Sequence, residues 1–483
     1  LAAVAVAVYV LWPGPGNAEF ESIAVLPFAN LSATPEDDYL VNGFKEELVQ
    51  TLHRIDGLTV INVRLEPAAD ARQSSVDTVL YGSLQRSGDV LKVSYTIEQP
   101  VDGKTLAAGD VSGSLDELFQ LQEQLAQAVQ AELYPGVTQV LVSRSRPASA
   151  MAYNEYMLGA FAFDRRGQPG NLEEAIRRFE ATIDLDPQYG PAYLQLATAH
   201  ALLPDYRGAD LAESNAEALA TVDLGIEMDP NIEAAAGAVY GFVYHKEKRW
   251  AESEAAYKRA VNAQFVDANA FNWYSRMLGS VGDLHGSLRI ARRGIDLAPD
   301  SAVLNSRVAM VYTWLGENDA ALRYFDRANA LGADGSTHLM AYALLLSRMG
   351  NVEASYTATQ TVIDLEGVGG EWVDPVFAAL ADPALSLDAL AAVDAASEKR
   401  ELTAQVEVVV RTFLGDVDGA MDIARRLEEP GEVFEMDLLY TPELRALREH
   451  PEFPGLMRRL GVLSYWRANN CVFMDGDVSC PDA

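Results

Sequence analysis

Between residues 20 and 135, short apolar blocks predict strands, and longer segments with apolar residues at helical spacing predict helices. The predicted helices are Asp38–Ile55 and Ser114–Leu133. The second begins with a capping box of Ser114 and Glu117. The predicted strands are Ser22–Phe28, Leu58–Val63, Thr78–Gly82 and Val90–Ile97. This order predicts one sheet covered by two helices, a small α/β domain at residues 20–135.

A different pattern follows, because residues of one kind recur every 34 positions. Gly282, Gly316 and Gly350 are the clearest series. Small residues keep the same step in the series Ser253, Ser287, Ala321 and Ser355, and in the series Ala260, Gly294 and Ala328. A third series with this step is Tyr257, Ala291 and Phe325. This is the tetratricopeptide (TPR) period, in which small residues stand where two helices of a hairpin cross and a glycine ends the first helix.

We therefore expect six to seven helical hairpins in a solenoid over residues 151–435, joined to the α/β domain by a linker at 136–150. The step from Pro187 to Pro230, two prolines that end repeats, is longer than the period and predicts an insertion at Pro204–Asp210. The expected fold class is α+β: a small α/β N-terminal domain followed by an all-α TPR solenoid.

The two ends of the chain carry further signals. Residues 1–12 are all apolar, but a helix of this length rises only ~18 Å, so they suit the C-terminal part of a transmembrane helix, followed by a linker at 13–19. The apolar core of a signal peptide is the alternative. Residues 436–483 are expected to cap the last repeat, and Cys471 and Cys480 to form a disulfide in an oxidising compartment.

Several phrases in the first domain resemble a known family. They are SIAVLPFANLS, DDYLVNGFKEELVQTLHRIDGLTVI, VLYGSLQRSGDVLKVSYTIEQPVDG and LDELFQLQEQLAQAVQAEL. Together they look like the TolB-N-terminal-like domain that lies between a transmembrane helix and TPR repeats in bacterial membrane proteins. The stretch Arg64–Val76 is shorter than usual in that family. The closing segment LYTPELRALREHPEFPGLMRRLGVLSYW also resembles the end of such proteins.

The resemblance implies a single-pass bacterial inner-membrane protein with residues 13–483 in the periplasm. It also implies that this domain is not catalytic. Proteins of this kind often carry a winged-helix or adenylate cyclase domain before the membrane helix, which here would lie upstream of residue 1.

The formal net charge is −33, from 70 acidic and 37 basic residues. So acidic a surface repels phosphate backbones, which argues against nucleic-acid binding by this portion. Its charge suits either solubility or a specific basic partner.

The sequence has no phosphate loop, HExxH or GxSxG motif and no metal-ligand spacing, so we expect no enzyme, cofactor or metal site. Asp475 and Asp477 suit an acidic turn better than a calcium site.

Binding is then the expected role. In TPR arrays the first helix of each hairpin lines a groove. The positions of each repeat that face this groove in such arrays are occupied here by Phe242, His245, Lys246, Asn269, Asn272, Arg276, Met310, Thr313, Trp314, Met340 and Arg348. The basic side chains among them, Lys246, Arg276 and Arg348, are suited to bind a peptide carboxylate or an acidic side chain. Alternatively, Trp314 packs inside its own hairpin and the bases are solvated.

We therefore expect a non-catalytic, membrane-anchored periplasmic module for protein–protein interaction, a scaffold or accessory subunit of a membrane complex. The alternative is the sensory half of a one-component signalling protein, with a winged-helix or adenylate cyclase effector upstream.

Overall fold

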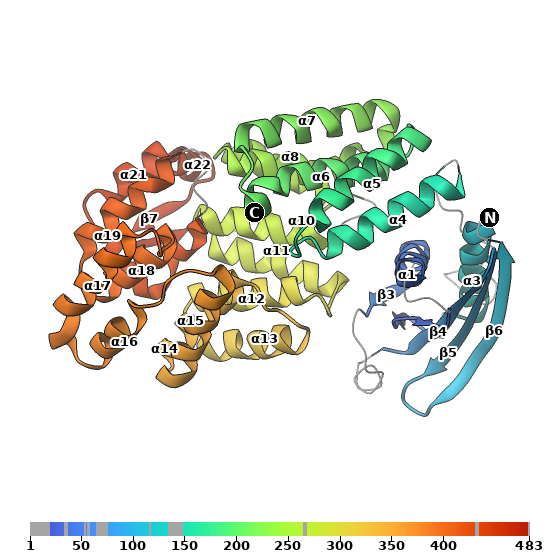
Figure 1. Ribbon diagram of the computed structural model, residues 1–483, viewed down its shortest axis with the longest axis horizontal. Coiled ribbons are helices and arrows are strands. Elements are labelled where there is room, and N and C mark those ends of the chain that lie inside the picture. Colours follow the sequence, from blue (N-terminus) through green and yellow to red (C-terminus); the bar gives the residue numbers. More distant parts are fainter. Residues whose placement is uncertain are drawn as a thin grey trace, which may run out of the picture. The chain divides into compact units, whose positions relative to one another are not determined.

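The computed structural model describes residues 20–32, 37–52, 55, 58–63, 76–114, 117–133, 147, 149–263, 268–429 and 434–481. The chain forms two compact units that divide after Met157 (Figure 1). A small unit with one sheet precedes a unit made mainly of paired helices, so the predicted fold class is confirmed.

The first unit is built on one mixed sheet. Its strands are β1 (Ser22–Val25), β2 (Ala29–Asn30), β3 (Thr59–Asn62), β4 (Thr78–Ser87), β5 (Val90–Gln99) and β6 (Lys104–Ser114). Their order is β3-β1-β4-β5-β6, and β2 pairs with β4. Strand β1 is parallel to both its neighbours, whereas β4, β5 and β6 are antiparallel. Helices α1 (Asp38–Leu52) and α3 (Leu118–Leu133) bury Phe44, Leu48 and Leu125 in its core.

Strand β6 is a difference from the prediction. Its sequence, KTLAAGDVSGS, is rich in small residues and has little of the apolar alternation that identifies a strand. Ser114 is its last residue, and the helix begins only at Leu118. The predicted reciprocal capping is present in one direction, since the Glu117 carboxylate accepts hydrogen bonds from the Ser114 amide at 2.8 Å and from its hydroxyl at 3.2 Å.

The second unit is a row of helix pairs. Its helices are α4 (Ala150–Asp164, which begins in the first unit), α5 (Asn171–Leu185), α6 (Gly190–Arg207), α7 (Leu211–Met228), α8 (Glu233–Lys246), α9 (Trp250–Ala260), α10 (Ala268–Ser280), α11 (Leu284–Leu297), α12 (Ala302–Trp314), α13 (Asn318–Ala330), α14 (Ser336–Arg348), α15 (Val352–Glu366), α16 (Val373–Ala381), α17 (Ser386–Glu398), α18 (Ala404–Phe413) and α19 (Val417–Ala424). Short 3-10 turns are η3 (Pro230–Ile232), η4 (Pro383–Leu385) and η5 (Arg425–Glu428).

Within the described residues, seven successive pairs from α6/α7 to α18/α19 pack side by side. Helices α10, α12 and α14 begin 34 residues apart, as the sequence period predicted. The structure shows how the chain accommodates the longer step around Pro204–Asp210. Pro204 lies inside α6, and α6 and α7 have 18 residues each, so the extra residues lengthen these two helices.

The repeated residues have clear physical roles. Gly282, Gly316 and Gly350 follow the first helix of their pairs with φ of 84°, 75° and 79°, in the left-handed region that glycine adopts at low cost.

The repeated serines tie the helices of a pair together. Ser253 donates a hydrogen bond to the carbonyl of Gly241 at 2.7 Å, twelve residues earlier. In the same way, the Ser287 hydroxyl donates to the carbonyl of Ser275, and the Ser355 hydroxyl donates to the carbonyl of Ala343.

A C-terminal segment, residues 434–480, packs against the repeats. It comprises η6 (Met436–Tyr440), η7 (Pro442–Leu444), α20 (Arg445–Arg448), α21 (Phe453–Arg459), α22 (Val462–Ala468) and a hairpin of β7 (Val472–Met474) and β8 (Asp477–Ser479). A disulfide joins Cys471 to Cys480 across this hairpin. The residues expected to cap the array are at most 2% exposed: Leu444, Leu447, Phe453, Leu456, Met457 and Leu460.

Two tryptophans fasten this segment through their indole N–H groups. Trp250 of α9 donates to the carbonyl of Leu460 at 2.8 Å. Trp466 of α22 donates to the carbonyl of Val281 at 2.6 Å. Both indoles are buried, so each hydrogen bond is shielded from water.

The predicted location of the protein has to be corrected. Among the described residues, no helix has both the length and the apolar character needed to cross a bilayer. This finding overturns the single-pass inner-membrane topology with residues 13–483 in the periplasm. Residues 1–12 and 13–19, together with most of the stretches 64–76 and 136–150, lie outside the described residues.

Candidate functional site

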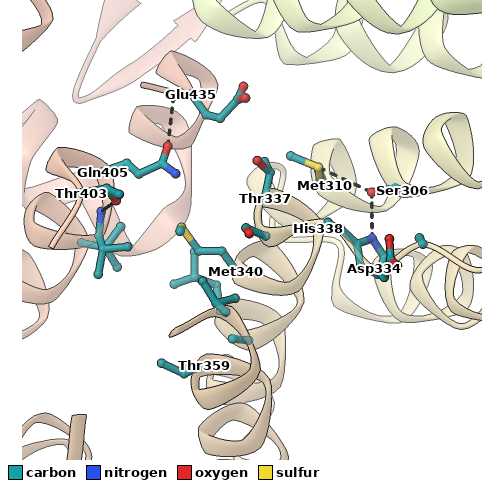
Figure 2. Close-up of a pocket in the computed structure, with 18 of the residues that line it drawn as sticks. Ser306, Met310, Asp334, Thr337, His338, Met340, Thr359, Thr403, Gln405 and Glu435 are labelled. Carbon is teal, nitrogen blue, oxygen red and sulfur yellow. Dashed lines mark hydrogen bonds between the residues drawn. The ribbon is translucent and has the colours of Figure 1, made fainter. Parts of the chain in front are cut away.

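The first helices of successive pairs line a cavity of about 860 Å³ (Figure 2). Helices α6, α8, α10, α12, α14, α16 and α18 supply most of the lining, and α15, the second helix of its pair, also contributes. We call this space the groove cavity. Apolar side chains such as Met310 and Met340 alternate with polar ones such as Thr337 and Gln405 (Figure 2). A mixed lining of this kind suits a peptide or a small molecule better than a charged polymer.

Six of the eleven predicted groove residues line this cavity: Phe242, Asn269, Asn272, Arg276, Met310 and Met340. The side chain of Asn272 is half-buried and has no hydrogen-bond partner among the described residues. Beside it, the ring of Trp273 lies 5.0 Å from that of Phe242. These groups offer a free amide and an aromatic surface to a bound chain.

The other five predicted residues do not line the cavity: His245, Lys246, Thr313, Trp314 and Arg348. Thr313 is fully buried and donates its hydroxyl hydrogen bond to the Ala309 carbonyl at 2.9 Å within its own helix. Arg348 forms an ion pair with Glu443 and donates to the carbonyl of Thr313 at 2.8 Å.

Two residues of α8 lie close to the cavity without facing it. The Lys246 ammonium forms an ion pair with Asp205, and burial lowers the pKa of Lys246 although Asp205 opposes that shift. His245 Nε2 lies 3.1 Å from the Ser280 hydroxyl. Burial lowers the pKa of His245 well below its ordinary value, and the positive charges of Arg276 and Lys246 lower it further. His245 is therefore neutral, and the positive charge of Lys246 is already balanced by the carboxylate of Asp205.

Acidic residues of the C-terminal segment engage the arginines of this face. Arg276 forms an ion pair with Glu435 at 2.6 Å, with both side chains about one-fifth exposed or less. Burial alone would lower the pKa of Arg276, but Glu435, Asp205 and Asp437 outweigh burial and raise it. Arg276 is therefore charged, and the chain itself supplies its carboxylate.

A second ion pair is deeper. Arg307 of α12 contacts Asp437 at 2.7 Å, with 4% and 0% of their side chains exposed. The same carboxylate oxygen of Asp437 accepts the indole N–H of Trp314 at 3.0 Å. Arg307 also donates to the Ser275 hydroxyl at 3.1 Å, which connects α12 to α10. The expected open surface around Trp314 is thus filled by the chain's own segment.

His338 forms a neutral polar cluster in the cavity wall. Its Nδ1 lies 2.8 Å from the Ser306 hydroxyl (Figure 2). Its Nε2 lies 2.8 Å from Oδ1 of Asn329. Since the amide oxygen can only accept, we assign the ring proton to Nε2. Burial lowers the pKa of His338 to about 4, so the ring stays uncharged near neutral pH.

Sequence reasoning missed the residues that hold the C-terminal segment in place. They are Arg307, Glu435, Asp437, Thr441 and Glu443. One signal was present: Arg307 is the only charged residue of α12 (AVLNSRVAMVYTW), and a charge within such an apolar helix needs a buried partner.

Over the part of the chain that the structure describes, no three His, Cys, Asp or Glu side chains are grouped closely enough to hold a metal ion.

No protein-family model matches this chain. Among curated proteins it is similar to "Putative adenylate cyclase 3" of Rhizobium meliloti, with 25% identity over 198 residues that make up 38% of this chain and 33% of that protein. It is also similar to Superkiller protein 3 of Schizosaccharomyces pombe, with 23% identity over 232 residues, 46% of this chain and 16% of that protein. The chain thus spans a third or less of these two relatives.

Several solved structures are similar in fold. YrrB, described as a TPR protein with an unusual peptide-binding site, is 18% identical and covers 39% of this chain and 92% of its own, with a TM-score of 0.28. PilW, a type IV pilus biogenesis factor, is 17% identical over 43% of this chain and 90% of its own, with a TM-score of 0.33. Human IFIT1 bound to PPP-AAAA is 14% identical over 72% and 77%, with a TM-score of 0.41. At such low identities and TM-scores, these likenesses do not bear on what this chain binds.

Proposed function

We propose that the chain is a non-catalytic protein-interaction module, a scaffold or accessory subunit, that binds a peptide segment of a partner protein in the groove cavity. The observation that carries this proposal is the cavity of about 860 Å³ along the first helices of consecutive repeats. Asn272 supports it, because a free amide in such a wall can donate to or accept from a peptide backbone.

The C-terminal segment limits how a partner enters. Glu435 lines the cavity, and Asp437 and Tyr440 behind it are buried against the repeats. A long chain therefore does not run past Arg276 toward Trp314 and Arg348, because the segment already occupies that part. We propose that the partner inserts a short segment between α12 and α18.

A substitution that fills the cavity tests the proposal. Asn272→Trp places a large ring in the cavity without breaking an existing hydrogen bond, so we expect the fold to persist and partner capture to fall at least about tenfold, an energy of about 1.4 kcal/mol. Glu353→Trp is the matched control, because Glu353 is exposed on α15 outside the cavity. Capture by pull-down with the purified chain should persist in this control. Equal capture by both variants would remove the cavity from the proposal.

A second candidate function has support of its own. The similarity to a protein named as a putative adenylate cyclase supports a regulatory region of a longer signalling protein, with a cyclase or winged-helix effector upstream. In this candidate the first unit is a TolB-N-terminal-like domain, as the phrases SIAVLPFANLS and VLYGSLQRSGDVLKVSYTIEQPVDG suggest.

The signalling candidate is tested in the full-length protein. If a cyclase domain is present, Asn272→Trp should change cyclic AMP production in cells that contain the partner, while Glu353→Trp should not. If neither a cyclase nor a winged-helix sequence lies upstream of residue 1, the scaffold function stands alone.

A further inference from the structure

The charges of the groove cavity differ from those that its sequence suggests. Three arginines line it, and the chain neutralises two of them, Arg276 and Arg307, through Glu435 and Asp437. An acidic ligand would therefore have to displace a carboxylate that is already in place. At these two arginines, the positive charge that would favour an acidic partner is compensated within the protein.

Two carboxylates of the lining form no ion pair among the described residues. Asp334, before α14, and Glu401, before α18, both line the cavity, and neither has an ion pair or hydrogen bond among the described residues. One oxygen of Glu401 is buried without a partner. Arg166 is the one cation lining the cavity that has no carboxylate partner within the described chain, and it is stacked against Phe163 with its guanidinium carbon 4.8 Å from the ring centroid.

A separate observation points to a missing hydrogen-bond acceptor. Trp372 lines the cavity at the start of α16, is 4% exposed, and its indole N–H has no acceptor among the described residues. A buried donor without an acceptor costs about 1–3 kcal/mol. A peptide carbonyl from a ligand would satisfy it after a small movement of the wall.

The aromatic lining agrees with a cationic ligand. Trp273 is half-buried beside Phe242, and the Lys246 ammonium already lies 5.5 Å from the Phe242 ring centroid. The negative face of an indole attracts a lysine or arginine side chain. With a net charge of −33, the whole molecule also attracts basic partners over a distance.

From these charges we infer that the groove cavity binds a basic peptide segment, whose cationic side chains lie at Asp334 and Glu401 and whose backbone accepts from Trp372. This inference rests on the proposed function and names the chemistry of its partner. The apolar side chains of the segment would contact Met310 and Met340.

Two labelled decapeptides test the inference. One alternates leucine with lysine and the other alternates leucine with glutamate, both with blocked ends, and fluorescence anisotropy measures their Kd for the whole chain. We expect the basic peptide to bind more tightly. The double variant Asp334→Asn/Glu401→Gln should raise its Kd about tenfold. Because neither carboxylate has a partner, this variant should fold normally, which circular dichroism checks.

The control removes the same two charges elsewhere. Glu353 and Asp364 are exposed on α15 outside the cavity, so Glu353→Gln/Asp364→Asn should change the Kd by less than about twofold. Equal weakening by both double variants would overturn the inference, because binding would then be general attraction to an acidic surface.

Other outcomes separate this inference from the proposed function. Tighter binding of the acidic peptide that is lost in Asn272→Trp would overturn the basic partner and leave the binding cavity in place. If neither peptide binds, and Asn272→Trp and Glu353→Trp capture the partner equally, both ideas fail.

Discussion

Trp314 donates its indole N–H to the carboxylate of Asp437 at 3.0 Å, a hydrogen bond that spans 123 positions of the chain. The acceptor is fully buried and also carries the charge that balances Arg307. This contact fixes η6 against α12, so that the C-terminal segment fills the space beside Trp314.

Trp314→Phe tests this contact. The phenyl ring keeps most of the apolar contact but leaves the buried carboxylate with one donor fewer, so we expect a loss of about 2 kcal/mol in the free energy of unfolding. Trp273→Phe makes the same change at a tryptophan that has no hydrogen bond among the described residues, and it should cost less. Urea unfolding measures both. Equal losses would mean that the hydrogen bond adds nothing.

The ion pair between Arg307 and Asp437 should couple strongly. Removing one partner leaves the other charge buried, which costs about 3–5 kcal/mol. We expect Asp437→Asn and Arg307→Met to be costly singly, and the double variant to lose clearly less than their sum. A double-mutant cycle in urea gives the coupling energy. Additive losses would contradict a direct ion pair.

Two repeat glycines form a matched pair for probing the C-terminal segment. Gly282 and Gly350 have φ of 84° and 79°, so alanine strains the backbone at both by about 1–2 kcal/mol. An added Cβ at Gly282 would lie 2.7 Å from a ring carbon of Tyr440, whereas one at Gly350 meets no atom within 4 Å. Gly282→Ala should therefore destabilise the chain more in thermal unfolding. Equal effects would show that Tyr440 does not pack there.

Stability should fall in acid because of His338. Its pKa drops from the ordinary 6.5 to about 4 in the folded chain, so the unfolded chain takes up this proton first. The stabilisation is complete above pH 6.5 and is lost as the pH falls toward 4. At about 1.36 kcal/mol for each unit of pKa shift, the loss in the free energy of unfolding is about 3 kcal/mol. His338→Gln should flatten this part of the pH profile, measured by urea unfolding. An unchanged profile would contradict a neutral buried ring.

Local patterns predicted the repeats well. A helix that ends in a left-handed residue strongly favours glycine, so Gly282, Gly316 and Gly350 mark three helix ends without any knowledge of the fold. The same reasoning identified most strands, but it missed β6. In β6 the residues are small and the strand is held by its antiparallel pairing with β5 rather than by its own propensity.

The candidate site was only partly predictable because its final shape depends on contacts far apart in the sequence. The repeat positions on the first helices that sequence reasoning selected include Phe242 and Met310, which line the cavity. They could not show that Glu435 and Asp437, more than a hundred residues beyond α12, occupy the neighbouring space. Ion pairs of this kind have no period and leave no local pattern.

Hydrogen–deuterium exchange of the chain with its captured partner tests most directly whether partners bind in the groove cavity. We expect slower exchange on binding in α10, α12, α14 and α18, whose side chains line the cavity, and little change in α11 and α13. Protection confined to α11 and α13, or to the first unit, would contradict it.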